Sequence, residues 1–175
     1  MANETGIEEA LCGEKMIFVG IDPGVTGAVA FLSETSRILY ATAVPTLTLT
    51  KSRRQIDGVE LTRQLLTLRE PGIETFITIE DVHAFPGQGV TSMFSFGKSF
   101  GQILGIIEAL GLRYQLVHPT RWQKLLFSGT AGEPKTRSRL AAHRLWPSNT
   151  SKHDGITDAL LLAEYGRRTW AGKNT

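Results

Sequence analysis

Three runs of apolar, β-branched and aromatic residues follow one another near the start of the chain, separated only by links of turn length. Links that short join antiparallel neighbours, so the three runs predict an antiparallel meander. Two more such runs follow, each reached through a segment with helical periodicity, which is typical of parallel strands. The predicted strands cover residues 17–21, 25–32, 37–44, 75–79 and 114–117, and the predicted helices cover residues 57–69, 91–110, 121–126, 136–145 and 153–168. This order predicts an α/β fold with a mixed five-stranded sheet, three antiparallel strands and then two parallel ones, flanked by helices.

The chain has the size of one ordinary domain. Its 175 residues are 41% hydrophobic, enough for a single core. Residues 1–14 are polar and show no periodicity, so we expect a flexible N-terminal tail and one domain over residues 15–170. Cys12 is the only cysteine, which excludes an internal disulfide and a cysteine-rich metal site. There is no bilayer-length apolar run and no secretory signal pattern, so we expect a cytoplasmic protein without a membrane partner.

Two of the predicted strands lead directly into a carboxylate. Asp22 follows the first strand and Glu80 follows the fourth. If these strands are parallel neighbours, both side chains leave the sheet at the same edge. Asp158 lies beside the apolar stripe of the last helix, and Asp154 lies four residues earlier on the same face. A turn, a strand end or a helix N-cap would explain each acid alone, but their convergence predicts a functional site.

These acids indicate a particular kind of metal. Carboxylates brought within a few ångströms repel one another and require a cation between them. Oxygen donors without cysteine favour Mg²⁺ or Mn²⁺ over zinc. A cluster of this kind suits two ions that activate water and stabilise the leaving oxygen of a phosphodiester.

Basic residues are concentrated in one part of the chain. Between Arg113 and Arg144 there are seven basic residues and a single acid, Glu133. Such an excess suits a phosphate backbone, although a solvated helix surface would also explain it. A second basic segment, over residues 45–56, is predicted to be a loop. The candidate DNA-binding residues are Lys51, Arg53, Arg54, Phe85, Lys98, Arg121, Lys124, Lys135 and Arg137.

Three acidic motifs, in order, resemble those of RuvC-like Holliday junction resolvases. They are Ile21-Asp22-Pro23-Gly24 with Thr26-Gly27, then Ile79-Glu80-Asp81-Val82, then His153-Asp154-Gly155-Ile156-Thr157-Asp158-Ala159-Leu160. The similarity is closest to the phage and prophage branch, in which the loop over residues 85–92 is also familiar, and it extends from residue 15 to 168. The resemblance implies an RNase H-like fold, which has the predicted order of elements. It also implies a protein of the bacterial cytoplasm, either bacterial or phage-encoded.

The resemblance implies a homodimeric endodeoxyribonuclease that nicks a four-way DNA junction symmetrically, with two Mg²⁺ or Mn²⁺ ions per active site. Asp22, Glu80 and Asp158 match the family's metal ligands. Bacterial members usually place an acid or a histidine three residues before the last aspartate, where this chain has Gly155. Asp154 is our choice for the fourth ligand.

Three further residues acquire roles from the same resemblance. His153 is the alternative to Asp154 and could assist proton transfer. Lys124 and Lys135 match basic residues beside the scissile phosphate. Lys135 is the better candidate for stabilising developing negative charge, although a plain backbone contact would also account for it.

Aromatic residues and glycines mark the segment around the predicted long helix. Phe85 could stack on unpaired bases at the opened crossover, whereas Phe96 and Phe100, at helical spacing, suit a core or a dimer interface. Glycines recur at every fourth position, which suits either a dimer contact or packing on the sheet; they are Gly97, Gly101 and Gly105.

Other function classes fit less well. The segment 129–136 looks like a phosphate-binding P-loop, but Pro134 stands where the pattern needs glycine, so we expect no nucleotide cofactor. Sugar kinases and actin relatives share the core fold but need a second domain, for which this chain is too short. A junction-binding module without catalysis, and a nuclease for other branched or RNA-containing substrates, remain as alternatives.

Overall fold

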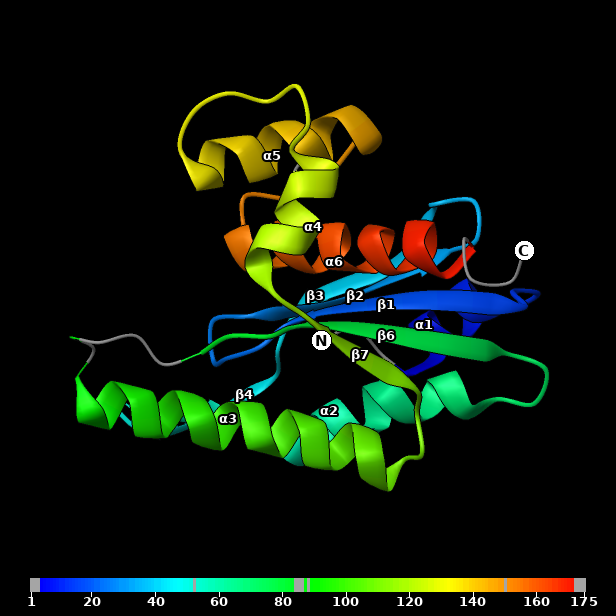
Figure 1. Ribbon diagram of the computed structural model, residues 1–175. Coiled ribbons are helices and arrows are strands. Elements are labelled where there is room, and N and C mark those ends of the chain that lie inside the picture. Colours follow the sequence, from blue (N-terminus) through cyan, green and yellow to red (C-terminus); the bar gives the residue numbers. More distant parts are fainter. Residues whose placement is uncertain (1–3, 52, 84–86, 88, 150, 172–175) are drawn as a thin grey trace.

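A five-stranded sheet with helices on both faces forms the centre of the protein. The computed structural model describes residues 4–51, 53–83, 87, 89–149 and 151–171. The strand order is β3-β2-β1-β6-β7. Figure 1 shows α2 and α3 on one face of the sheet and α4, α5 and α6 on the other.

The sheet is mixed, as the sequence predicts. Strands β1, β2 and β3 form an antiparallel meander, whereas β6 pairs in parallel with both β1 and β7. The bounds are β1 (Met16–Asp22), β2 (Ala28–Ser33), β3 (Ile38–Ala43), β6 (Glu74–Glu80) and β7 (Tyr114–Val117). β2 begins later than predicted because residues 24–27 form a turn, in which the Gly27 N–H donates to the Gly24 carbonyl.

Each face of the sheet packs against its own helices. Helices α2 (Gly58–Leu66) and α3 (Val90–Ala109) cover one buried cluster, and α4 (Pro119–Leu126), α5 (Pro134–Leu145) and α6 (Asp154–Ala171) cover the other. Asp57 caps α2 as predicted, since its carboxylate accepts the N–H groups of Val59 and Glu60. A short 3₁₀ helix, η1 (Thr67–Arg69), completes the predicted 57–69 segment.

Glycine lets α6 approach the sheet closely. A Cβ on Gly20 of β1 would overlap the backbone oxygen of Ala159 and the backbone nitrogen of Ala163. No larger residue fits this crossing. Because Gly20 is two residues from Asp22 and Ala159 follows Asp158, the contact brings these two acids toward one another.

The prediction of a flexible tail over residues 1–14 is wrong for the residues that the structure describes. Residues 4–11 form α1 (Glu4–Leu11), and Ile7 and Leu11 are buried in the core. These two apolar side chains are four residues apart and share one helix face, a signal too short to stand out in a polar segment.

The prediction of a loop over residues 45–56 is also wrong. This segment contains β4 (Thr46–Thr50) and β5 (Arg53–Ile56), which form a separate two-stranded antiparallel sheet. Alternating threonine and leucine give β4 a strong strand propensity. The basic residues Lys51, Arg53 and Arg54 therefore lie at the tip and on the second strand of a hairpin.

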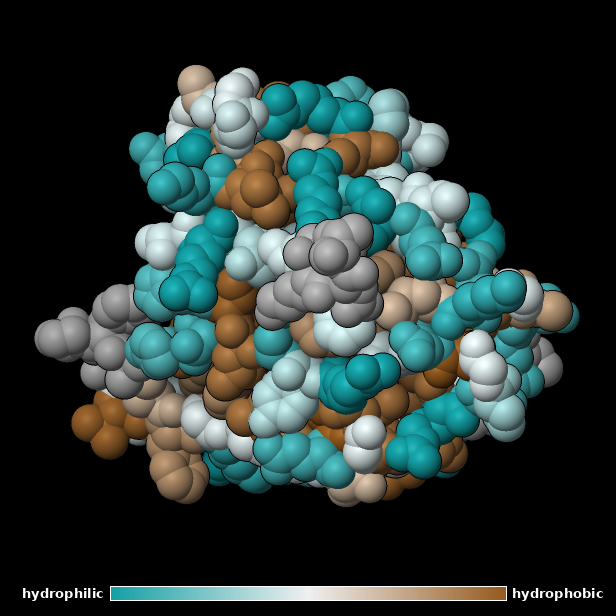
Figure 2. Space-filling model, turned by 45° about the vertical axis from the view of Figure 1, so that its right-hand side comes forward, coloured by the Kyte–Doolittle hydropathy of each residue, from teal (hydrophilic) through white to brown (hydrophobic). Residues whose placement is uncertain are grey.

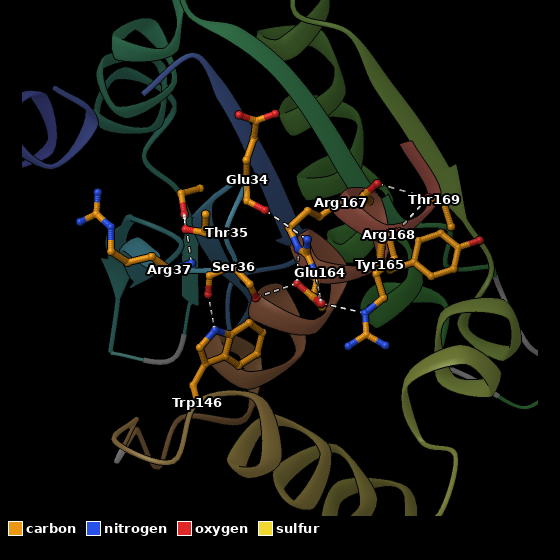
Figure 3. A network of polar contacts seen from close by, with 12 residues as sticks. Glu34, Thr35, Ser36, Arg37, Trp146, Glu164, Tyr165, Arg167, Arg168 and Thr169 are labelled. Atoms are coloured by element: carbon orange, nitrogen blue, oxygen red, sulfur yellow. Dashed lines mark hydrogen bonds and ion pairs between the residues drawn. The ribbon is translucent and has the colours of Figure 1, made fainter. Parts of the chain in front are cut away.

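A buried carboxylate joins α6 to the turn between β2 and β3. Glu164 is fully buried and accepts hydrogen bonds from Arg167, Arg168 and the Ser36 hydroxyl at 2.7–2.8 Å (Figure 3). Burial alone would raise the pKa of Glu164, but these hydrogen bonds outweigh it and lower the pKa. The Trp146 indole N–H donates to the Ser36 carbonyl in the same network (2.7 Å).

Glu164→Gln is expected to lower the free energy of unfolding by about 2 kcal/mol, because the two arginines would face a neutral amide in a buried site. Urea denaturation measures this. Glu60→Gln is the matched control, since it alters an exposed ion pair with Arg63 (2.9 Å) and should change stability by at most about 0.5 kcal/mol. Equal losses in both variants would contradict a special contribution of the buried network.

No helix in the described part of the chain is long and apolar enough to cross a membrane.

Candidate active site

Two carboxylates leave the sheet side by side. Strands β1 and β6 are parallel neighbours in which Ile21 pairs with Ile79, so Asp22 and Glu80 follow at equivalent positions. The carboxyl ends of parallel strands lie at one edge of a sheet, where ligands commonly bind. The prediction that these two acids lie at the same edge of the sheet is confirmed.

Asp158 of α6 completes an acidic cluster with them. Burial, together with the negative charges of Asp158 and Glu80, raises the pKa of Asp22 to about 8. A carboxylate whose pKa is perturbed in this way by burial and like charges is a candidate functional residue. The tertiary structure thus brings the first, second and third acidic motifs together.

Two of these carboxylates accept hydrogen bonds from α4 and α5. The Trp122 indole N–H donates to Glu80 Oε1 at 2.9 Å, and the Ser138 hydroxyl donates to Asp158 Oδ1. Burial raises the pKa of both Glu80 and Asp158, although each hydrogen bond acts in the opposite direction. Sequence reasoning missed Trp122 and Ser138, because a buried tryptophan and a helical serine carry no motif of their own.

Asp154 has basic partners in this structure. Its carboxylate accepts two hydrogen bonds from Arg139, at 2.6 and 3.1 Å, and lies 3.3 Å from Lys135 Nζ. Hydrogen bonds from Arg139 and Lys135 lower the pKa of Asp154. Its role as the fourth ligand stays a prediction, and Arg139 joins the residues that sequence reasoning missed.

The two residues beside Asp154 have distinct surroundings. His153 is exposed, and its Nδ1 accepts the backbone N–H of Ile156 at 3.3 Å, so the ring caps α6. Gly155 is buried against the first acidic motif: a Cβ there would lie 2.9 Å from the Thr26 carbonyl oxygen and 3.0 Å from Asp22 Oδ2. A larger residue would crowd the site, which accounts physically for glycine at this position.

The donor set suits a hard divalent cation, because it consists of three half-buried carboxylates whose negative charges act on one another. As they lie, no three His, Cys, Asp or Glu side chains in the described ranges are arranged closely enough to hold one ion. Glu80 and Asp158 are hydrogen-bonded to Trp122 and Ser138, and Asp154 forms ion pairs with Lys135 and Arg139, so each of these carboxylates is engaged by a protein partner. The chemistry of the residues therefore fits Mg²⁺ or Mn²⁺, with a further approach of the carboxylates on binding.

The candidate DNA-binding residues lie on both sides of this edge. On one side are the β4–β5 hairpin and Lys98 of α3, whose Nζ lies 3.4 Å from Gln55 Oε1 of β5. On the other are Arg121 and Lys124 of α4 and Lys135 of α5, all exposed. Arg137 is half-buried, with its guanidinium 5.0 Å from the centre of the Phe127 ring. Phe85 lies outside the described residues.

The aromatic residues of α3 have separate roles in packing. Phe96 stacks on Phe100, with the ring centres 6.2 Å apart. Phe100 packs against the core, and a Cβ on Gly24 would lie 3.7 Å from the Phe96 ring. Phe96 thus lies beside the turn that follows Asp22, at the beginning of α3.

Solved structures that resemble this chain include two of RuvC. The structure described as T. thermophilus RuvC in complex with Holliday junction substrate matches with a TM-score of 0.63 and 16% sequence identity, covering 90% of this chain and 96% of that chain. A Thermus thermophilus RuvC structure matches with a TM-score of 0.56 and 14% identity, covering 91% and 98%. No protein-family model and no curated protein matches the sequence. The likeness extends over nearly the whole of both chains, and the chain therefore has the RuvC-like form of the RNase H-like fold.

Proposed function

We propose that this chain is a divalent-metal-dependent endodeoxyribonuclease that resolves four-way DNA junctions by paired, symmetric nicks. The observation that carries the proposal is the acidic cluster: Asp22 and Glu80 at the ends of adjacent parallel strands, with Asp158 of α6 beside them. The similarity to RuvC bound to a Holliday junction substrate supports the choice of DNA substrate.

Asp22, Glu80 and Asp158 would hold two Mg²⁺ or Mn²⁺ ions, with Asp154 as the fourth ligand. Bound there, the ions would activate a water molecule and neutralise charge on the leaving 3′ oxygen. The chain itself supplies the half-buried edge of the sheet, where electrostatic contacts with the scissile phosphate would be stronger than in bulk water. Lys135, 80% exposed at the beginning of α5, can turn from Asp154 to that phosphate.

The basic residues on both sides of the acidic edge suit two arms of a branched DNA. The hairpin begins beside the acidic edge, because the Val44 N–H donates to the Gly27 carbonyl in the turn after Asp22. Lys51, Arg53 and Arg54 would contact phosphates on this side, and Lys124 of α4 would do so on the other.

We also propose that the protein acts as a homodimer through the outer face of α3. Val90 and Phe94 are 85% and 75% exposed there, and Figure 2 shows hydrophobic residues at the surface over the beginning of this helix. A Cβ on any of the three recurring glycines would meet nothing within 4 Å; these are Gly97, Gly101 and Gly105. The glycines therefore do not pack on the sheet, and a second α3 could approach them closely. Two sites related by a two-fold axis would account for paired nicks.

Lys135→Ala is expected to slow the single-turnover rate of nicking by roughly 10²- to 10³-fold, because one donor to developing negative charge is lost. Junction affinity should change much less. Quenched-flow cleavage and fluorescence anisotropy measure the two effects. Lys51→Ala, at the hairpin tip, is the control and should weaken binding without changing the bound rate. Equal losses of rate and affinity for Lys135→Ala would make Lys135 an ordinary phosphate contact.

The direct test compares nicking of four-way, flap and RNA–DNA substrates, in Mg²⁺ and in EDTA. We expect Mg²⁺-dependent nicks at symmetric positions of the four-way junction, with ends that a ligase can join. Tight junction binding without cleavage in Mg²⁺ or Mn²⁺ would instead support a binding module. Preferred cleavage of a flap or a hybrid would redirect the proposal to another substrate.

A further inference from the structure

We propose that Trp122 and Ser138 are positioning residues: each anchors one oxygen of Glu80 or Asp158, so that the second oxygen stays available to a divalent cation when the carboxylates approach one another. This proposal rests on the proposed function of the acidic cluster. Neither residue belongs to an acidic motif, and each comes from a helix outside the strands that carry Asp22 and Glu80.

Trp122 is fixed by its own packing. It is 2% exposed on α4, and its ring lies edge-on to Phe127, with the centres 5.3 Å apart and the planes at 82°. An indole has one polar hydrogen, and when buried it needs an acceptor. Here that acceptor is Glu80 Oε1, at 2.9 Å. The rigid ring therefore determines where this oxygen lies.

Ser138 acts in the same way on Asp158. It is 5% exposed on α5, and its hydroxyl donates to Asp158 Oδ1. Within the described residues, the second oxygen of each carboxylate, Oε2 of Glu80 and Oδ2 of Asp158, accepts no hydrogen bond. One oxygen of each carboxylate is thus anchored, and the other is left for a cation.

Anchoring of this kind matters because a ligand that is already oriented loses less conformational freedom when it binds a metal. Outer hydrogen bonds to ligating carboxylates contribute about 10- to 100-fold to metal affinity or activity. Trp122 lies on the same helix as Lys124, and Ser138 lies on the same helix as Lys135. The packing of α4 and α5 on the sheet therefore determines the positions of both the carboxylates and the basic residues.

The test compares Trp122→Phe with Trp146→Phe. Both changes keep an aromatic ring and remove one buried indole N–H; that of Trp146 donates at 2.7 Å to the Ser36 carbonyl, away from the acids. We expect Trp122→Phe to weaken Mn²⁺ binding, measured by calorimetry without DNA, by about 10- to 100-fold. The Mn²⁺ concentration needed for half-maximal nicking should rise by a similar factor. Trp146→Phe should leave the Mn²⁺ affinity and the Mn²⁺ requirement for nicking within about twofold of the wild-type values, even if it lowers the melting temperature as much as Trp122→Phe does.

Ser138→Ala provides a second variant, with Ser99→Ala as its control. Ser99 is also buried, on α3, and its hydroxyl donates at 3.1 Å to the Ser95 carbonyl in its own helix. Ser138→Ala should reduce Mn²⁺ affinity, as Trp122→Phe does. Ser99→Ala should leave Mn²⁺ affinity unchanged. This pair decides the proposal if Trp122→Phe fails to fold.

The outcomes separate this proposal from the proposed function. If the wild-type chain nicks junctions and both variants bind Mn²⁺ as their controls do, positioning by Trp122 and Ser138 is overturned while the nuclease stands. If the wild-type chain nicks no branched DNA but the two variants still lose Mn²⁺ affinity, the nuclease proposal fails and the positioning role is supported.

Discussion

Asp158→Asn is expected to abolish junction cleavage, with a loss on the order of 10³-fold or more in the single-turnover rate. Loss of a ligand that sets the position of a catalytic ion removes several kcal/mol of transition-state stabilisation. The amide keeps the size of the side chain and can still accept the Ser138 hydroxyl. Junction binding should survive or tighten, because one negative charge facing the phosphate backbone is removed.

Cleavage in Mg²⁺ and binding in EDTA measure the two effects separately. Asp57→Asn is the matched control: it makes the same chemical change at the N-cap of α2, where asparagine is as good a cap as aspartate. It should leave cleavage unchanged. Cleavage by Asp158→Asn at the wild-type rate would remove the basis of the proposed active site.

Asp22→Asn is expected to stabilise the metal-free protein above neutral pH and to flatten its pH dependence. In the folded chain, burial and the charges of Asp158 and Glu80 raise the pKa of Asp22 from 3.8 to about 8. Between these two values the folded chain keeps a proton that the unfolded chain has lost. The free energy of unfolding of the wild type therefore falls as the pH rises through this window, and the decrease is complete above pH 8.

The effect at pH 8 should be on the order of 5 kcal/mol in favour of Asp22→Asn. Urea denaturation in EDTA at several pH values between 4 and 8 measures it, with Asp57→Asn as the control. For the wild type, Mn²⁺ should bind more tightly as the pH rises toward 8, because binding requires the carboxylate and releases its proton. Parallel stability profiles for wild type and Asp22→Asn would contradict the raised pKa.

Much of the fold could be predicted from periodicity and turn signals. The run before Asp22 is apolar at nearly every position, and the run before Glu80 combines apolar residues with the β-branched Thr75 and Thr78, which are also buried, as expected of strands covered on both faces. Strand β3 runs in the same direction as β1, because two antiparallel pairings separate them. The connection from β3 to β6 passes through α2, so the crossover rule predicts that β6 is also parallel to β1. Apolar runs and crossover length together are sufficient to place both carboxylates at one edge of the sheet.

The errors share a physical cause. α1 and the β4–β5 hairpin both depend on contacts with segments far away in the chain, even though the threonine–leucine alternation of β4 is itself a local strand signal. Ile7 and Leu11 form a helix face because the core receives them, and in isolation eight residues would not hold a helix. The hairpin at residues 46–56 is held against α3, through Gln102, which donates to the Ile56 carbonyl at 3.4 Å.

Hydrophobic periodicity and crossover length are local properties of the chain, and they are enough to predict the types of element, the order of the acidic motifs and the edge of the sheet at which Asp22 and Glu80 lie. The surroundings of those acids depend instead on the tertiary structure. It brought Trp122 to Glu80, Ser138 to Asp158, and Arg139 with Lys135 to Asp154. Hydrogen bonds between side chains 42 and 20 positions apart depend on how helices dock on the sheet, and that docking is set by packing rather than by sequence spacing.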